Sequence, residues 1–234
     1  MVTITSIAIF ALQSAIFVLF VVAVRERNTA AAVNALGALL LSVLPSVVAV
    51  ASQPLLARSV TVGHALPAWL AVAGVLHSLG MLGQYESTWW WDHLTHVVSA
   101  ALVAAFVYAA LVVTHPGPVQ PTSPGTVLAT VTALFTFTVG IFWELVELVA
   151  RDVGERFDVE PVLVYYGRRD TALDLVFDVV GALLIVGVDL RLFVPLVEQY
   201  PEATRAMLVG SGWLVLGGSV LLALVVGLGN ATRG

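Results

Sequence analysis

The sequence predicts an all-α protein, a polytopic transmembrane helix bundle of about seven spans with its N-terminus outside. Of its 234 residues, 59% are hydrophobic and 11% are charged, and the mean hydropathy is +0.99. Soluble domains carry about 25% charged residues. Several apolar runs also reach about 20 residues, the length that an α-helix needs to cross the hydrocarbon core. We therefore expect a single integral membrane domain over residues 1–234 and a multi-pass protein of the cell membrane.

Seven apolar runs, separated by charged or turn-forming segments, define the expected spans. The first run lacks a preceding basic segment and a cleavage site, so it predicts an uncleaved span and no signal peptide. Pro45 lies inside the second run and favours a kink there. Proline and glycine mark a loop after the fourth run. The runs cover residues 4–24, 30–50, 68–82, 92–113, 126–150, 170–193 and 206–228.

Arginine counting predicts the orientation of these spans. Basic residues favour the cytoplasmic loops of membrane proteins, and every basic residue of this chain is an arginine. With the N-terminus outside, the cytoplasmic arginines are Arg25, Arg27, Arg151, Arg156, Arg168, Arg169 and Arg233, and the outer ones are Arg58, Arg191 and Arg205. The starts of the fourth and sixth spans and the end of the fifth then share the cytoplasmic face.

Composition also excludes several kinds of chemistry. The chain has no cysteine, which excludes disulfides, thiolate metal sites and cysteine nucleophiles. It has no lysine, which excludes Schiff-base chemistry and a lysine general base. Its net charge of -5 comes without a basic tract, so we expect membrane lipid and no nucleic acid as a partner.

The sixth span carries three aspartates, which are costly inside a membrane. An acidic residue near the centre of a transmembrane helix costs about 2.5 to 3.5 kcal/mol and usually faces a bundle interior or a water-filled cavity. Asp170, Asp174 and Asp178 are four residues apart, so they lie within an arc of roughly 80°. The other acids and histidines expected near the cytoplasmic face of the membrane are Asp92, His93, His96, Glu144 and Glu147.

This group holds more negative charge than the nearby arginines can neutralise, so it needs a cation or protons. Carboxylates and imidazoles suit a divalent ion such as Mg, Mn, Zn or Fe. The candidate metal ligands are His96, Glu144, Asp174 and Asp178, the candidate catalytic bases are Asp92 and Glu147, and the candidate residues for a phosphate-bearing headgroup are Arg168 and Arg169. An ion-paired structural network and a proton or ion pathway are the alternatives.

Three motifs lie between about residues 91 and 184, the motif core of the chain. They are Trp91-Asp92-His93-Leu94-Thr95-His96, the acidic pair Glu144 and Glu147, and Asp174-Leu-Val-Phe-Asp178-Val-Val-Gly181 preceded by Asp170-Thr171. In these motifs the chain resembles the YjdF-like family of small multispan membrane proteins, within the broader VanZ-like group. Asp178 replaces the asparagine that is common in VanZ-like members. The resemblance implies a membrane fold with a polar site in this core.

The leading functional prediction is a metal-dependent intramembrane enzyme, a hydrolase or transferase. Its substrate would be a lipid or a lipid-linked, phosphate-bearing molecule at the cytoplasmic leaflet. A transporter or a proton- or ion-coupled permease is the first alternative, because intramembrane carboxylates also bind coupling ions and protons. The acids gather near one face, which favours a one-sided pocket over a pathway through the membrane. A structural membrane subunit is the second alternative.

Overall fold

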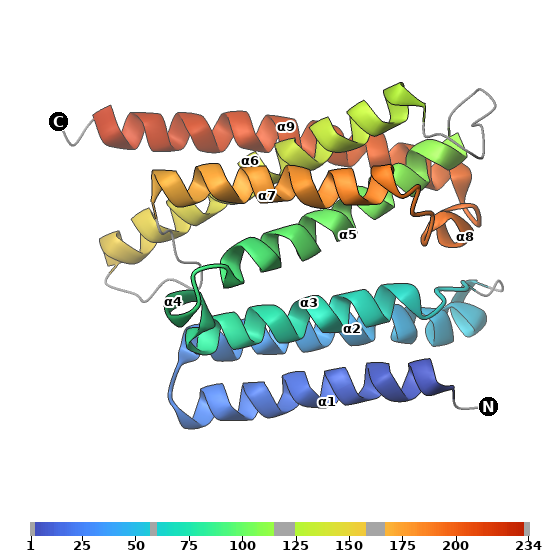
Figure 1. Ribbon diagram of the computed structural model, residues 1–234, viewed down its shortest axis with the longest axis horizontal. Coiled ribbons are helices and arrows are strands. Elements are labelled where there is room, and N and C mark those ends of the chain that lie inside the picture. The colour runs from blue at the N-terminus through green and yellow to red at the C-terminus, as the bar shows by residue number, and fades with distance from the viewer. Residues whose placement is uncertain (1–2, 57–59, 115–124, 158–166, 232–234) are drawn as a thin grey trace. The chain divides into compact units, whose positions relative to one another are not determined.

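The computed structural model describes residues 3–56, 60–114, 125–157 and 167–231, and all its regular elements there are helices (Figure 1). Six segments in these ranges are long and apolar enough to cross a membrane. They belong to α1 (Ile4–Arg25), α2 (Thr29–Leu56), α3 (Ala65–Leu79) with its extension to Ser87, α5 (Trp91–Thr114), α6 (Thr126–Phe157) and α9 (Pro201–Ala231). The predicted polytopic all-α fold is confirmed, and the chain is a multi-pass membrane protein.

The seventh expected span corresponds to α7 (Arg168–Gly187). Its 20 residues rise about 30 Å at 1.5 Å per residue, which matches the hydrocarbon core of a bilayer. It is less apolar than the other six helices because it carries three aspartates. Two of these, Asp174 and Asp178, are buried inside the protein.

The C-terminal end predicted for this span, at residue 193, is wrong. Asp189 adopts a left-handed backbone conformation with φ of 51°, and Leu190 N donates to Ile185 O at 3.0 Å. Both features are typical of a helix that stops. Glycine or asparagine usually occupies the left-handed position, so an aspartate there is a weak stop signal in a sequence. Asp189 therefore lies past the end of α7.

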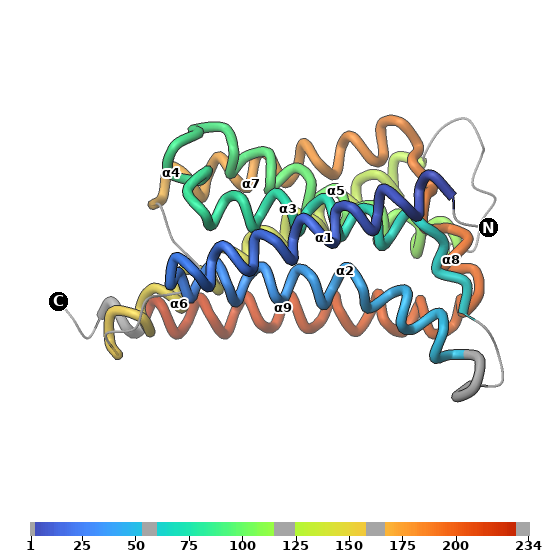
Figure 2. The backbone as a smooth tube through the Cα atoms, turned by 90° about the horizontal axis from the view of Figure 1, so that it is seen from below, coloured from blue at the N-terminus to red at the C-terminus, as the bar shows by residue number. Residues whose placement is uncertain are grey.

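The chain forms two compact units, residues 1–95 and 96–234. In the first unit α1, α2 and α3 contact one another pairwise and lie side by side (Figures 1 and 2). Their core is formed by Ile16, Ala35 and Ala71. Gln13 Nε2 donates to Ser42 O at 3.0 Å, which joins α1 to α2 through a polar contact.

A distortion ends α3. The π-helical segment η1 (Gly80–Gln84) and the short α4 (Tyr85–Ser87) follow it, and Gly83 has φ of 116°, a conformation that glycine adopts without steric cost. Tyr85 closes back over the distortion, because its hydroxyl lies 2.7 Å from His77 Nδ1. His77 thus has a hydrogen-bond partner within its own unit.

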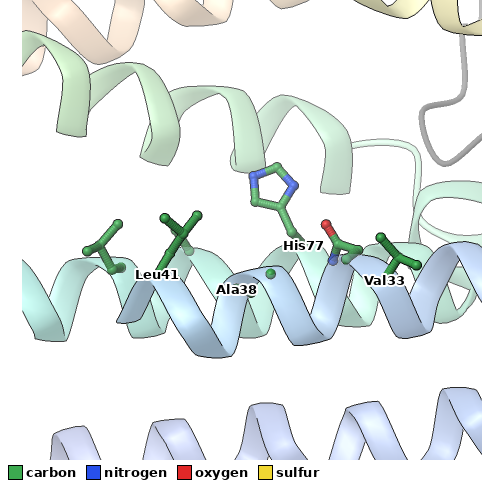
Figure 3. Close-up of a pocket in the computed structure, with 9 residues that line it drawn as sticks. Val33, Ala38, Leu41 and His77 are labelled. Atoms are coloured by element: carbon green, nitrogen blue, oxygen red, sulfur yellow. The ribbon is translucent and has the colours of Figure 1, made fainter. Parts of the chain in front are cut away.

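A cavity of about 260 Å³ lies between α2 and α3 in this unit (Figure 3). Val33, Ala38 and Leu41 line it with apolar surface, and Asn34 and His77 add the polar atoms. Its lining includes no carboxylate. It therefore lacks the charged oxygen ligands with which proteins usually hold a hard divalent cation.

In the second unit α6 contacts both α7 and α9 (Figures 1 and 2). Helix α7 also approaches α5 closely at Gly181, where a β-carbon would lie 2.6 Å from Val97 O and 3.0 Å from Ala101 N. Small residues let transmembrane helices approach in this way. Most large apolar side chains of α9 are exposed, including Trp213 and Leu214, so lipid is their natural surroundings.

A polar cluster joins α5 to the turn between α7 and α8 (Val194–Val197). Tyr108 Oη donates to Asp189 Oδ1 at 2.6 Å, and Arg191 Nε donates to the same oxygen at 2.7 Å. Phe106 and Phe193 stack beside it, with ring centroids 4.2 Å apart. The cluster fixes the end of α7 against α5.

We expect this cluster to make the stability of the fold decrease as the pH falls in the acid range. Burial raises the pKa of Asp189, but hydrogen bonds from Arg191 and Tyr108 lower it by more, so its pKa lies below the ordinary value. The carboxylate then stabilises the fold fully above its unfolded pKa of about 3.9, and this contribution is lost as the pH falls through the folded pKa. Melting temperatures of the wild type and Asp189→Asn should differ near neutral pH, and the difference should shrink as the pH falls below the unfolded pKa and through the lower folded pKa. A difference that stays constant over this range would contradict the prediction.

Candidate metal site

His96 lies between two aspartates of α7. Its Nδ1 is 3.1 Å from Asp178 Oδ1, and its Nε2 is 3.9 Å from Asp174 Oδ1. Both aspartates are nearly completely buried, at 2% exposed for Asp174 and 5% for Asp178. The predicted face of α7 therefore points inward, and both imidazole nitrogens face a carboxylate.

Such an arrangement needs extra positive charge. A neutral imidazole has one N–H donor and one bare nitrogen, and a bare nitrogen cannot bond a carboxylate oxygen directly. A second ring proton, a protonated carboxyl group or a metal ion at the bare nitrogen would satisfy the pair. The site can thus hold either a proton or a cation.

Helix α6 adds two residues to the group formed by His96 of α5 and the aspartates of α7. Gly140 lies against Asp178, where a β-carbon would collide with Asp178 Oδ2. One turn further on, Glu144 is 4% exposed and lies close enough to His96, Asp178 and Asp170 to interact with them electrostatically. Its Oε1 is buried and has no hydrogen-bond partner among the described residues. Glu144 therefore offers one buried oxygen as an acceptor near the imidazole.

Asp92 precedes His96 by one turn on α5. Asp92 belongs to the first unit, whereas His96, Glu144, Asp174 and Asp178 belong to the second.

The predicted residues thus divide into two groups. His96, Glu144, Asp174 and Asp178, the predicted metal ligands, lie near one another within the second unit. Glu147 has a different contact, because its Oε1 accepts a hydrogen bond of 2.8 Å from Trp143 Nε1 on its own helix. Arg168 and Arg169 are exposed in the first turn of α7.

Arginines of the second unit form ion pairs elsewhere. Arg151 lies 3.1 Å from Asp152 and 3.7 Å from Glu155, and Arg191 pairs with Asp189. These carboxylates belong to other parts of α6 and to the turn after α7. Each of these two guanidinium groups thus pairs with at least one carboxylate outside the group around His96.

Three site features were missing from the sequence prediction. They are the contact of Gly140 with Asp178, and the buried hydroxyls of Thr132 and Thr136 on the same face of α6. The four-residue spacing of these positions from Glu144 is visible in the sequence. Their burial is not visible there, because threonine is common on both polar and apolar helix faces.

One family model matches the chain, over residues 7–194, and its description is "Predicted membrane protein (DUF2238)". This range includes His96, Glu144, Asp174 and Asp178. No curated protein matches the chain, and no solved structure matches it. The family match supports a membrane protein, while the narrower resemblance to YjdF-like and VanZ-like proteins stays a prediction.

Proposed function

The chain belongs to the DUF2238 family of predicted membrane proteins, and from this premise we propose that it is a metal-dependent intramembrane enzyme. The observation that carries the proposal is the geometry of His96. The distance of 3.9 Å from Nε2 to Asp174 is too long for a hydrogen bond. Two ligand atoms of one tetrahedral ion, each about 2.0 to 2.2 Å from it, lie about 3.3 to 3.6 Å apart, so a small movement of these side chains would let them share an ion.

The other nitrogen of His96 supports the same proposal. Histidines that bind metals usually donate their second N–H to a carboxylate or carbonyl, which fixes the tautomer and the ring orientation. The 3.1 Å contact between Nδ1 and Asp178 has this form. We therefore assign His96 and Asp174 as ligands, and Asp178 as the residue that orients His96.

Glu144 is the best candidate for the general base in this proposal. It is buried beside the imidazole, and its Oε1 is free to accept a proton from a water or hydroxyl group. Glu147, predicted as a base from the sequence, accepts a hydrogen bond from Trp143 at one of its two oxygens. A divalent ion at His96 would polarise a phosphoryl or ester oxygen of the substrate.

The proposed substrate is a lipid or a lipid-linked molecule with a phosphate group. Arg168 and Arg169 are exposed at the start of α7, on the helix that also carries Asp174, and guanidinium groups bind phosphate oxygens well. The cytoplasmic leaflet follows from the predicted orientation, which stays a prediction. Two of the arginines used for it, Arg58 and Arg233, lie outside the described residues.

Metal content and melting temperature test this proposal. We expect purified protein in mild detergent to retain about one divalent ion per chain, and chelator to lower its melting temperature. An ion at 100 times its dissociation constant stabilises the fold by about 2.7 kcal/mol, which corresponds to roughly 5 to 11 °C for a chain of this size. Protein without metal whose melting no Mg, Mn, Zn or Fe ion shifts would refute the metal site.

The enzymatic part needs a separate assay. Metal-loaded protein is incubated with total membrane lipids, and the lipids are compared by mass spectrometry before and after. We expect the wild type to consume a phosphate-bearing lipid and the Glu144→Gln variant to leave it intact. The variant should still bind metal, which shows that its site is otherwise preserved. Metal binding without any lipid conversion would instead favour the transporter alternative.

A further inference from the structure

Two buried threonines continue the polar face of α6 beyond Glu144. Thr132 is 0% exposed and Thr136 is 1% exposed. With Gly140 and Glu144 they follow one another at intervals of four residues, so all four lie within an arc of about 120°. Gly140 and Glu144 face α7. This α6 polar face is about 18 Å long at 1.5 Å per residue.

The hydroxyls of these two threonines differ from others on the same helix. Thr130 Oγ1 donates to Thr126 O at 2.7 Å, and Thr138 Oγ1 donates to Leu134 O at 2.8 Å, the usual bond for a helical threonine. The side-chain oxygens Thr132 Oγ1, Thr136 Oγ1 and Glu144 Oε1 are buried without a hydrogen-bond partner in the described part of the chain. The unpaired atoms thus follow one face of α6.

Buried polar atoms without a protein partner commonly bind ordered water. We propose that the α6 polar face encloses a chain of water molecules that connects Glu144 with the end of α6 near Thr126.

This path adds water access to the site and does not depend on a metal. Acidic residues inside a membrane usually face a bundle interior or a water-filled cavity, and a chain of water molecules would hydrate the buried Glu144. Water access is therefore tested on its own.

Single-cysteine variants can test water access position by position, because the natural chain has no cysteine. The test variants are Thr132→Cys and Thr136→Cys, and the matched controls on the same helix are Thr130→Cys and Thr138→Cys. Each variant is reconstituted in lipid vesicles without divalent ions and treated with dilute Ag⁺. Ag⁺ reacts with the thiolate, which forms in water and is disfavoured in apolar surroundings.

We expect the thiols at positions 132 and 136 to react at least about tenfold faster than those at 130 and 138. Reaction at position 132 or 136 that is no faster than the controls overturns the water path. Circular dichroism and gel filtration check that each variant folds, and Thr132→Cys decides the question if Thr136→Cys does not fold. Fast reaction in a protein that binds no metal would keep the water path and reject only the metal site.

Discussion

Replacing Asp174 with asparagine is expected to abolish the rise in melting temperature that divalent cations cause in the wild type. The variant loses a charged ligand oxygen that lies 3.9 Å from His96 Nε2, and the remaining ligands hold the ion weakly. Without metal, the substitution is expected to raise the melting temperature. Removal of one of several buried carboxylates reduces their mutual repulsion, so the metal-free variant should melt above the metal-free wild type.

Asp178→Asn should behave differently, because Asp178 contacts Nδ1 and not the nitrogen that faces Asp174. Loss of a residue that orients a metal ligand typically weakens metal affinity by about 10- to 100-fold. At an ion concentration that stabilises the wild-type fold by about 2.7 kcal/mol, the same ion should stabilise the variant by about 0.4 to 1.4 kcal/mol. Titration of melting temperature against ion concentration measures both affinities.

Asp152→Asn provides the matched control, since it also removes one carboxylate from the second unit. Asp152 pairs with Arg151 at 3.1 Å and lies about two turns beyond Glu144 on α6, and its replacement should leave the response to metal unchanged. If Asp152→Asn and Asp174→Asn lose the cation-induced rise in melting temperature equally, cations act through general charge screening. Equal behaviour of Asp174→Asn and Asp178→Asn would contradict the separate roles that we assign to them.

Gly181→Ala is expected to lower the stability of the second unit. The new β-carbon would lie 2.6 Å from Val97 O and 3.0 Å from Ala101 N, and these are backbone atoms that cannot rotate away. Helices α5 and α7 must separate, and overpacking of this kind typically costs about 1 to 3 kcal/mol. The melting temperature should fall by roughly 2 to 12 °C.

The same substitution should weaken metal binding, because α5 carries His96 and α7 carries Asp174 and Asp178. Gly37→Ala is the control, since a β-carbon at Gly37 meets nothing within 4 Å. Alanine is a better helix former than glycine by about 0.5 to 1 kcal/mol, so this control should melt at or above the wild-type temperature. A Gly181→Ala variant with an unchanged melting temperature would show that α5 and α7 are not in close contact there.

The sequence by itself determined the fold class and the existence of the polar group. Apolar runs long enough to cross a bilayer predict transmembrane helices whatever their neighbours are, because backbone polar groups must be paired within the lipid. The spacing of Asp170, Asp174 and Asp178 fixed a common face in the same way, because it depends only on helical geometry.

Tertiary structure decided which residues of that group meet. Glu144 and Glu147 are only three residues apart, yet Glu144 is buried beside His96 and Glu147 accepts a hydrogen bond from Trp143. Local sequence does not set the rotation of α6 about its axis; the packing of Gly140 against Asp178 does. The end of α7 at Gly187 likewise depends on Asp189, whose left-handed conformation accompanies bonds to Tyr108 and Arg191. Those partners lie on another helix and in the following turn, so helical periodicity alone could not reveal them.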